Sequence, residues 1–205
     1  MTKIFILLLT LIGIIACQEK PTGKLPFIGE SKVVNGDTIL YQIPDFTFIN
    51  QDGQVVNNES YSNKIYVADF FFISCPSICP KVRQQMLRIH DKYLNDDRIE
   101  LISHTLDPKR DTVEALAKYA DKLEVKSSKW DFVTGEKDSI YGLNEKYFVV
   151  AYEDDEAPGG IDHSGKMILV DHNRHVRGFA EGTDPESVTK FLKTIDVLLE
   201  EYPID

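Results

Sequence analysis

The chain has 205 residues, and 42% of them are hydrophobic, which is enough to bury one core and gives no sign of a second folded domain. Its 33 acidic residues outnumber its 23 basic residues, so the formal net charge is −10 at pH 7. Because such a surface repels phosphates, the composition argues against nucleic acid as a partner.

Residues 1–16 have the layout of a secretory signal peptide. Lys3 supplies the positive start, residues 4–15 form a short apolar stretch, and Ala16 and Cys17 follow. This layout resembles a bacterial lipoprotein signal, which is cleaved before a cysteine that then carries lipid. We therefore predict lipidation of Cys17 and anchoring to a membrane of a bacterial cell envelope, facing the periplasm or the outside. An ordinary signal peptide or a signal anchor is the alternative, although the stretch is short for a span.

Residues 17–36 contain prolines and glycines among polar neighbours and show no sustained hydrophobic period, so we predict a flexible tether. The folded domain is expected over residues 37–205. At its start, short strands are predicted at 39–42 and 46–49. The residues Asn-Gln-Asp-Gly at 50–53 then indicate the turn of a β-hairpin.

A long apolar strand is predicted at 65–73, followed by an amphipathic helix at 77–95, in which apolar residues recur every three or four positions. A strand at 99–106 comes next, and the helix after it begins with a capping box formed by Asp111 and Glu114. The remaining expected elements are a strand at 130–133, a helix at 139–148, an exposed acidic loop at 153–160, strands at 167–170 and 176–180, and a helix at 185–201. This order predicts an α/β, thioredoxin-like fold with an added N-terminal β-hairpin.

Two thiols, Cys75 and Cys79, lie where the apolar strand gives way to a helix. The free N–H groups at a helix start stabilise a thiolate. Four residues make about one helical turn, so both sulfurs can point the same way and come within disulfide range. The pair therefore predicts either a redox site or a site for a soft metal ion.

Cu(I) is a soft ion that prefers thiolate sulfur and accepts imidazole as a further ligand. Among the histidines, His163 ranks first, because its glycine-rich loop, 159–165, is expected to pass beside the cysteine pair. His104 is a second neighbour, but a strand histidine is more often a packing residue. The other histidines, expected on a helix surface or in a turn, are His90, His172 and His175.

Three stretches of the sequence combine into a specific pattern. They are Asp69-Phe70-Phe71-Phe72 leading into Cys75-Pro76-Ser77-Ile78-Cys79-Pro80, then Leu106-Asp107-Pro108-Lys109-Arg110-Asp111-Thr112, and Asp162-His163-Ser164. Together they resemble the SCO/SenC family of copper-binding, thioredoxin-fold assembly proteins, over roughly residues 40–200. The resemblance implies one copper ion per chain, Cu(I) or Cu(II), held by Cys75, Cys79 and His163. It also implies a role in building the binuclear copper centre of cytochrome c oxidase.

Two functions are consistent with these residues. The first is a copper metallochaperone that delivers its ion to the copper-site subunit of cytochrome c oxidase. The second is a membrane-tethered thiol-disulfide oxidoreductase, in which Cys75 and Cys79 are the redox-active pair and reduce the dithiol of a copper-site client. A thiol peroxidase is the weakest reading, because residues 68–75 lack the pattern Pro-x-x-x-Thr-x-x-Cys. Asp107 and Arg110 are interpreted as turn residues after a strand.

Overall fold

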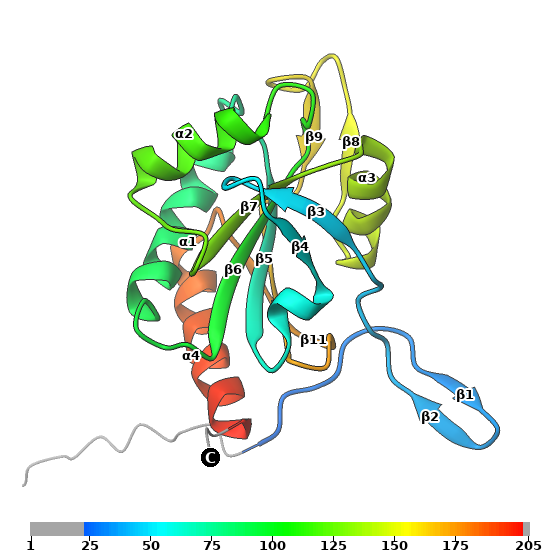
Figure 1. The fold of residues 1–205 in the computed structure, drawn as a ribbon. Coiled ribbons are helices and arrows are strands. Elements are labelled where there is room, and N and C mark those ends of the chain that lie inside the picture. Colours follow the sequence, from blue (N-terminus) through cyan, green and yellow to red (C-terminus); the bar gives the residue numbers. More distant parts are fainter. Residues whose placement is uncertain (1–22, 203–205) are drawn as a thin grey trace, which may run out of the picture.

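The computed structural model describes residues 23–202 (Figure 1). The predicted signal peptide and Cys17 lie outside the described residues. The strands are β1 (Lys32–Val34), β2 (Asp37–Ile39), β3 (Thr47–Asn50), β4 (Val55–Asn57), β5 (Ile65–Phe71), β6 (Ile99–Thr105), β7 (Trp130–Thr134), β8 (Ala151–Glu153), β9 (Ile161–His163), β10 (Lys166–Val170) and β11 (Val176–Glu181). The helices are α1 (Cys79–Lys92), α2 (Val113–Leu123), α3 (Lys137–Lys146) and α4 (Pro185–Glu201), with a short 3₁₀ helix η1 (Asn58–Tyr61).

The main sheet has seven strands in the order β11-β10-β5-β6-β7-β3-β4. Strands β5, β6 and β7 run parallel, and β10 and β3 flank them in antiparallel orientation. Helices α1, α2 and α4 lie on one side of this sheet and α3 on the other (Figure 1). Strand β5 runs through the middle, and all seven of its residues are buried, as expected for a parallel strand that is covered on both faces.

The predicted fold class, α/β and thioredoxin-like with an added N-terminal hairpin, is confirmed. The predicted hairpin is formed by β3 and β4, and β3 joins the main sheet by pairing with β7. The strand predicted at 39–42 is wrong, because only Ile39 belongs to a strand there. That strand, β2, pairs with β1 around Asn35 and Gly36, both at positive φ. Asn-Gly is the preferred turn of such a hairpin, and this signal lay inside the range that we assigned to a tether.

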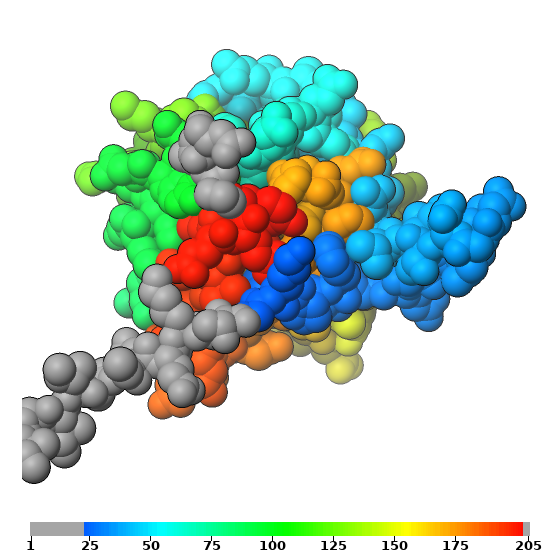
Figure 2. All heavy atoms as spheres, turned by 90° about the horizontal axis from the view of Figure 1, so that it is seen from below, coloured from blue at the N-terminus to red at the C-terminus, as the bar shows by residue number. Residues whose placement is uncertain are grey.

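Part of the predicted tether is bound to the folded body. Arg177, 1% exposed, donates from Nη2 to the Leu25 carbonyl at 2.8 Å and from Nε to the Pro26 carbonyl at 3.2 Å. Its charge is balanced by Asp171 and by Glu201 at the end of α4. Figure 2 shows this N-terminal segment, in dark blue, beside the end of α4, with the β1–β2 hairpin standing out from the body. The chain therefore enters the body at the C-terminal end of α4.

No helix within residues 23–202 combines the length and apolar character that crossing a membrane requires. The other predicted elements are present, most of them with shifted ends: α1 is shorter than the predicted helix at 77–95, and α3 begins and ends two residues earlier than predicted. Of the acidic loop predicted at 153–160, Glu153 is the last residue of β8, and residues 154–160 connect β8 to β9; these two short paired strands were not predicted.

Candidate metal centre

The two cysteines lie at the carboxyl end of β5. Cys75 belongs to the turn after this strand and donates its backbone N–H to the Phe72 carbonyl at 3.2 Å. Cys79 is the first residue of α1, and Pro80 follows it within the first turn, where a missing N–H costs nothing. Both side chains are buried, each at 6% relative exposure. The local sequence thus places both sulfurs at one edge of the sheet, as predicted.

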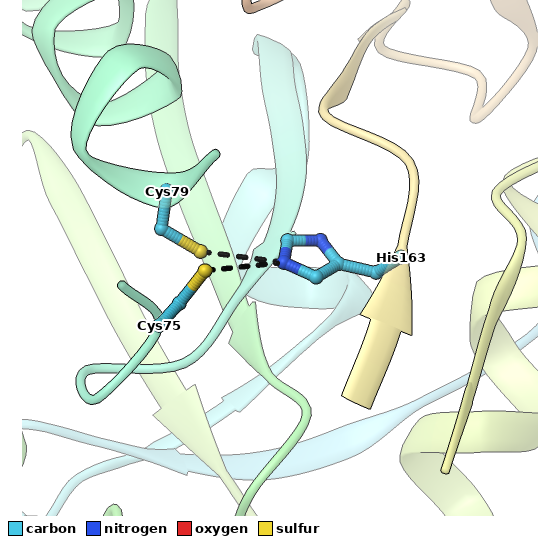
Figure 3. A group of neighbouring side chains, drawn as sticks. All are labelled: Cys75, Cys79 and His163. Carbon is cyan, nitrogen blue, oxygen red and sulfur yellow. Dashed lines mark hydrogen bonds between the residues drawn. The ribbon is translucent and has the colours of Figure 1, made fainter. Parts of the chain in front are cut away.

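His163 reaches the cysteines from the other side. It is the last residue of β9, where it pairs with Ala151 of β8, so the prediction that it lies in a loop is wrong. The pairing of two strands explains the difference, because it gives the backbone of this segment regular partners. The imidazole Nε2 lies 3.4 Å from Cys79 Sγ and 3.8 Å from Cys75 Sγ (Figure 3). The three ligand atoms all lie within 4.8 Å of one another.

A glycine lets the β8–β9 hairpin approach the cysteine loop closely. Gly159 has φ +88°, and a Cβ at this position would lie only 2.8 Å from the ring of Phe72 and 3.4 Å from Pro76. The Phe72 ring in turn meets the His163 ring edge-on at 5.6 Å between centroids. A larger residue at 159 would therefore force the Phe72 ring or the hairpin backbone to shift, and its side chain would be strained at this positive φ.

The two thiols differ in acidity. Burial opposes ionisation of Cys75, but the backbone N–H groups of Cys79 and Ser77 outweigh it, so the pKa of Cys75 is lowered. Burial raises the pKa of Cys79 far above its usual value, and the neighbouring Cys75 and Asp69 add to the increase. Cys75 is therefore the thiol that ionises first, while Cys79 keeps its proton until a metal ion or a disulfide partner replaces it.

Burial also lowers the pKa of His163, partly offset by the backbone of Ser164 and the charge of Asp162. The imidazole is thus neutral at pH 7 and has a lone pair to offer. Two sulfurs and one imidazole nitrogen, with no carboxylate among them, suit a soft ion and do not suit Mg²⁺ or Ca²⁺. In the part of the chain that the structure describes, no other group of three such side chains comes together.

The structure separates His104 from this centre. It is fully buried, and its ring lies among the aromatic rings of Phe46, Phe48, Phe70 and Tyr147, where neither nitrogen has a hydrogen-bond partner among residues 23–202. Burial lowers the pKa of His104 to about 3. The packing role that we predicted for His104 is thus correct, but the hydrogen-bonding capacity of its two ring nitrogens is not satisfied.

The other histidines also lie outside the centre. The expectation that His90 lies on the helix surface is wrong, because it is buried against Trp130. His172 and His175 belong to the turn between β10 and β11, as expected.

Two further groups near the site were assigned differently by the sequence. Asp111 is buried and accepts from the Ile73 N–H at 3.1 Å and from the Thr105 hydroxyl at 2.5 Å. The predicted capping box is therefore wrong, because the N-cap of α2 is Thr112, whose hydroxyl accepts from the backbone N–H three residues on. Arg110 forms an ion pair with Asp107, and its guanidinium also donates to the Gly159 carbonyl, outside its own turn. The only signal in the sequence for these two residues was the run of polar residues that follows the buried strand β6.

Comparison with known proteins finds chains that are similar to this one. The profile of the family described as SCO1/SenC matches residues 40–196. An SCO2-like protein of Rickettsia felis is 31% identical over 206 residues, which cover 93% of this chain and 95% of that protein. This similarity extends over nearly the whole of both proteins.

Two solved structures show the same fold. BsSco, a member of the Sco family of cytochrome c oxidase assembly proteins in which a disulfide switch was identified, is 27% identical, with a TM-score of 0.65 over 77% of this chain and 93% of that one. Arabidopsis thaliana ScoI with copper bound is 24% identical, with a TM-score of 0.62 over 75% of this chain and 97% of that one.

Proposed function

This chain belongs to the SCO1/SenC family, and on that basis we propose that it is a copper metallochaperone that delivers copper to the binuclear copper centre of cytochrome c oxidase. The observation that carries the proposal is the meeting of Cys75, Cys79 and His163 within 4.8 Å in a buried position. Such a donor set matches the preference of Cu(I) for thiolate and imidazole. The relation to a named assembly protein supports the client.

The three ligand residues have different roles in the capture and release of copper. Cys75, the more acidic thiol, binds the incoming ion first, and Cys79 gives up its proton as the second sulfur binds. His163 completes the set as a neutral donor. Release then proceeds by ligand exchange with no change in copper oxidation state: the β8–β9 hairpin withdraws His163, and the ligands of the partner replace the two thiolates in turn.

The difference in thiol acidity favours a second candidate function, a thiol-disulfide oxidoreductase. The Cys75 thiolate attacks a disulfide of the client and forms a mixed disulfide. Cys79 then loses its proton and attacks Cys75 Sγ, which releases the client dithiol and leaves a disulfide between the two cysteines. Two electrons pass to the client, and a dithiol reductant must restore the pair. The two functions are compatible, because a client dithiol has to be reduced before it can take up copper.

We further propose that the mature protein begins at a lipidated Cys17 in a bacterial envelope. The N-terminal segment supports this arrangement, because residues 25–28 are bound at the C-terminal end of α4. Figure 1 shows that this end lies opposite β9, the strand that carries His163. A membrane anchor at residue 17 would therefore leave the metal centre directed away from the lipid.

Titration of the reduced protein with Cu(I) against a competing chelator tests the metal proposal. One copper per chain is expected, and the double variant Cys75→Ser, Cys79→Ser should bind none at the same chelator concentration. His172→Ala is the matched control, because this residue lies in a turn outside the centre. Stoichiometric copper in the double variant would show that the cysteines are not the ligands.

A further inference from the structure

Three segments that are distant in sequence meet beside the metal centre. They are the cysteine loop after β5, the turn at residues 107–111 after β6, and the connection between β8 and β9. The middle segment contacts both of the others. It therefore links the part of the chain that carries the sulfurs to the part that carries the imidazole.

The link to the cysteine loop is made by a buried carboxylate. The Asp111 carboxylate, 2% exposed as a residue, accepts from the Ile73 N–H at 3.1 Å, two residues before Cys75. The same oxygen accepts from the Thr105 hydroxyl at the end of β6, and the Leu106 N–H donates to the Phe71 carbonyl at 2.7 Å. These hydrogen bonds hold the turn at residues 107–111 against the cysteine loop.

The link to the histidine side is a single exposed side chain. Arg110 Nη2 donates to the Gly159 carbonyl at 3.3 Å, and its Nε donates to the Asp107 carboxylate, which orients the guanidinium. The Arg110 side chain is 58% exposed, so water competes for this contact. Gly159 is the residue whose close approach to Phe72 brings the hairpin against the cysteine loop.

We propose that Arg110 is a positioning residue that latches the β8–β9 hairpin over the cysteines and thereby controls how fast His163 leaves a bound copper ion. This proposal deepens the proposed function and rests on it for its copper readout. The buried Asp111 contact keeps the turn in place while the exposed Arg110 contact opens, so the hairpin can move without disturbing the sulfurs. The latch acts on the rate of copper release and leaves the donor set unchanged.

The test compares Arg110→Met, which keeps a long apolar stem without donors, with Arg110→Lys and with the neighbouring exposed control Lys109→Met. Transfer of copper from the loaded full-length protein to a chelator should be about 3- to 10-fold faster in Arg110→Met, the range that one hydrogen-bonded contact provides. Arg110→Lys should recover part of the effect, because an ammonium can reach the Gly159 carbonyl or Asp107 but lacks the fork that holds both. Lys109→Met should release copper at the wild-type rate.

A double variant separates this role from a general loss of structure. If Arg110 acts through His163, then Arg110→Met should cause no further acceleration in a His163→Ala background. The X-ray absorption spectrum of the copper-loaded Arg110→Met variant should keep the nitrogen contribution of His163. Equal acceleration in both backgrounds, or release at the wild-type rate from Arg110→Met, would overturn the proposal.

A measurement on the metal-free protein tests the latch independently of copper binding. Amide hydrogen exchange at residues 159–163 of the reduced apo protein should be several-fold faster in Arg110→Met than in wild type or Lys109→Met. If the wild type failed to bind copper but this acceleration were seen, the latch would stand and the proposed function would fall. Unchanged exchange in the apo variant would refute the latch whatever the protein binds.

Discussion

The imidazole of His163 lies 3.4 Å from the sulfur of Cys79, although 84 residues separate the two in the chain. Cys79 is placed by the start of α1, and His163 by the pairing of β9 with β8. The contact therefore depends on two independent elements that meet at one edge of the sheet.

His163 distinguishes copper binding from thiol exchange. Replacing it by alanine removes the nitrogen donor and should weaken copper binding by at least about tenfold, since even residues that only orient a ligand contribute 10- to 100-fold. Disulfide reduction of a model substrate should stay near the wild-type rate, because it needs only Cys75 and Cys79. Chelator competition and a disulfide-reduction assay on the same preparation measure the two. A variant that binds copper normally but reduces poorly would favour the oxidoreductase.

Oxidation of the cysteine pair should compete with copper. A disulfide between Cys75 and Cys79 removes both thiolates, so the oxidised protein should bind Cu(I) only after treatment with a reductant. In the reduced apo protein, alkylation at pH 7 to 8 should modify Cys75 before Cys79, because the pKa of Cys75 is lowered and that of Cys79 is raised. Mass spectrometry of peptides gives the order. Faster alkylation of Cys79 would contradict the assigned roles of the two thiols.

Asp69 makes stability depend on pH near neutrality. Burial raises its pKa to about 7 from a usual value of 3.8, although the Ser103 hydroxyl donates to it. The folded state thus favours the protonated carboxyl, and this contribution is complete below pH 4 and is lost as the pH rises through 7. Asp69→Asn should unfold at higher denaturant concentration than wild type above pH 7, by a free energy of about 1 to 4 kcal/mol. Denaturation curves at pH 5 and pH 8 measure it, with exposed Asp155→Asn as the control; an equal difference at both pH values would argue against it.

His104→Leu should stabilise the protein. Its two buried nitrogens have no hydrogen-bond partner among the surrounding aromatic rings, and such groups cost about 1 to 3 kcal/mol. Because burial lowers the pKa of His104 to about 3, the wild type also loses stability as the pH falls below about 6.5, and the variant should lose less. Thermal unfolding at pH 7 and pH 5 tests both points. Copper stoichiometry should not change, and a loss of copper would place His104 in the metal site.

Cys17 should anchor the protein. Cleavage and lipidation there would give a mature chain that fractionates with membranes, whereas Cys17→Ala should yield an unprocessed or soluble protein. Mass spectrometry of the mature N-terminus identifies the modification directly. Truncation before Leu25 should leave the fold intact, because the contacts of Arg177 begin at that residue. An unmodified N-terminus at any other position would refute the lipid anchor.

The local sequence was sufficient for the parts of the molecule that depend on neighbouring residues. The apolar run that forms β5 and the cysteine pair after it were both placed correctly, because strand burial and a strand-to-helix turn are encoded within a few positions. The terminal helix α4 begins and ends at the predicted residues. Even the choice of His163 followed from a fold class that local patterns had indicated.

The tertiary structure decided what depends on residues brought together from afar. Pairing of β8 with β9 turned the expected loop of His163 into a strand, and burial together with the backbone N–H groups around Cys75 separated the acidities of Cys75 and Cys79. Asp111 fits the local pattern of a helix cap, yet its buried carboxylate accepts from the Ile73 N–H and so holds the cysteine loop. Hydrogen bonds and desolvation depend on distances across the fold, and no spacing along the chain contains them.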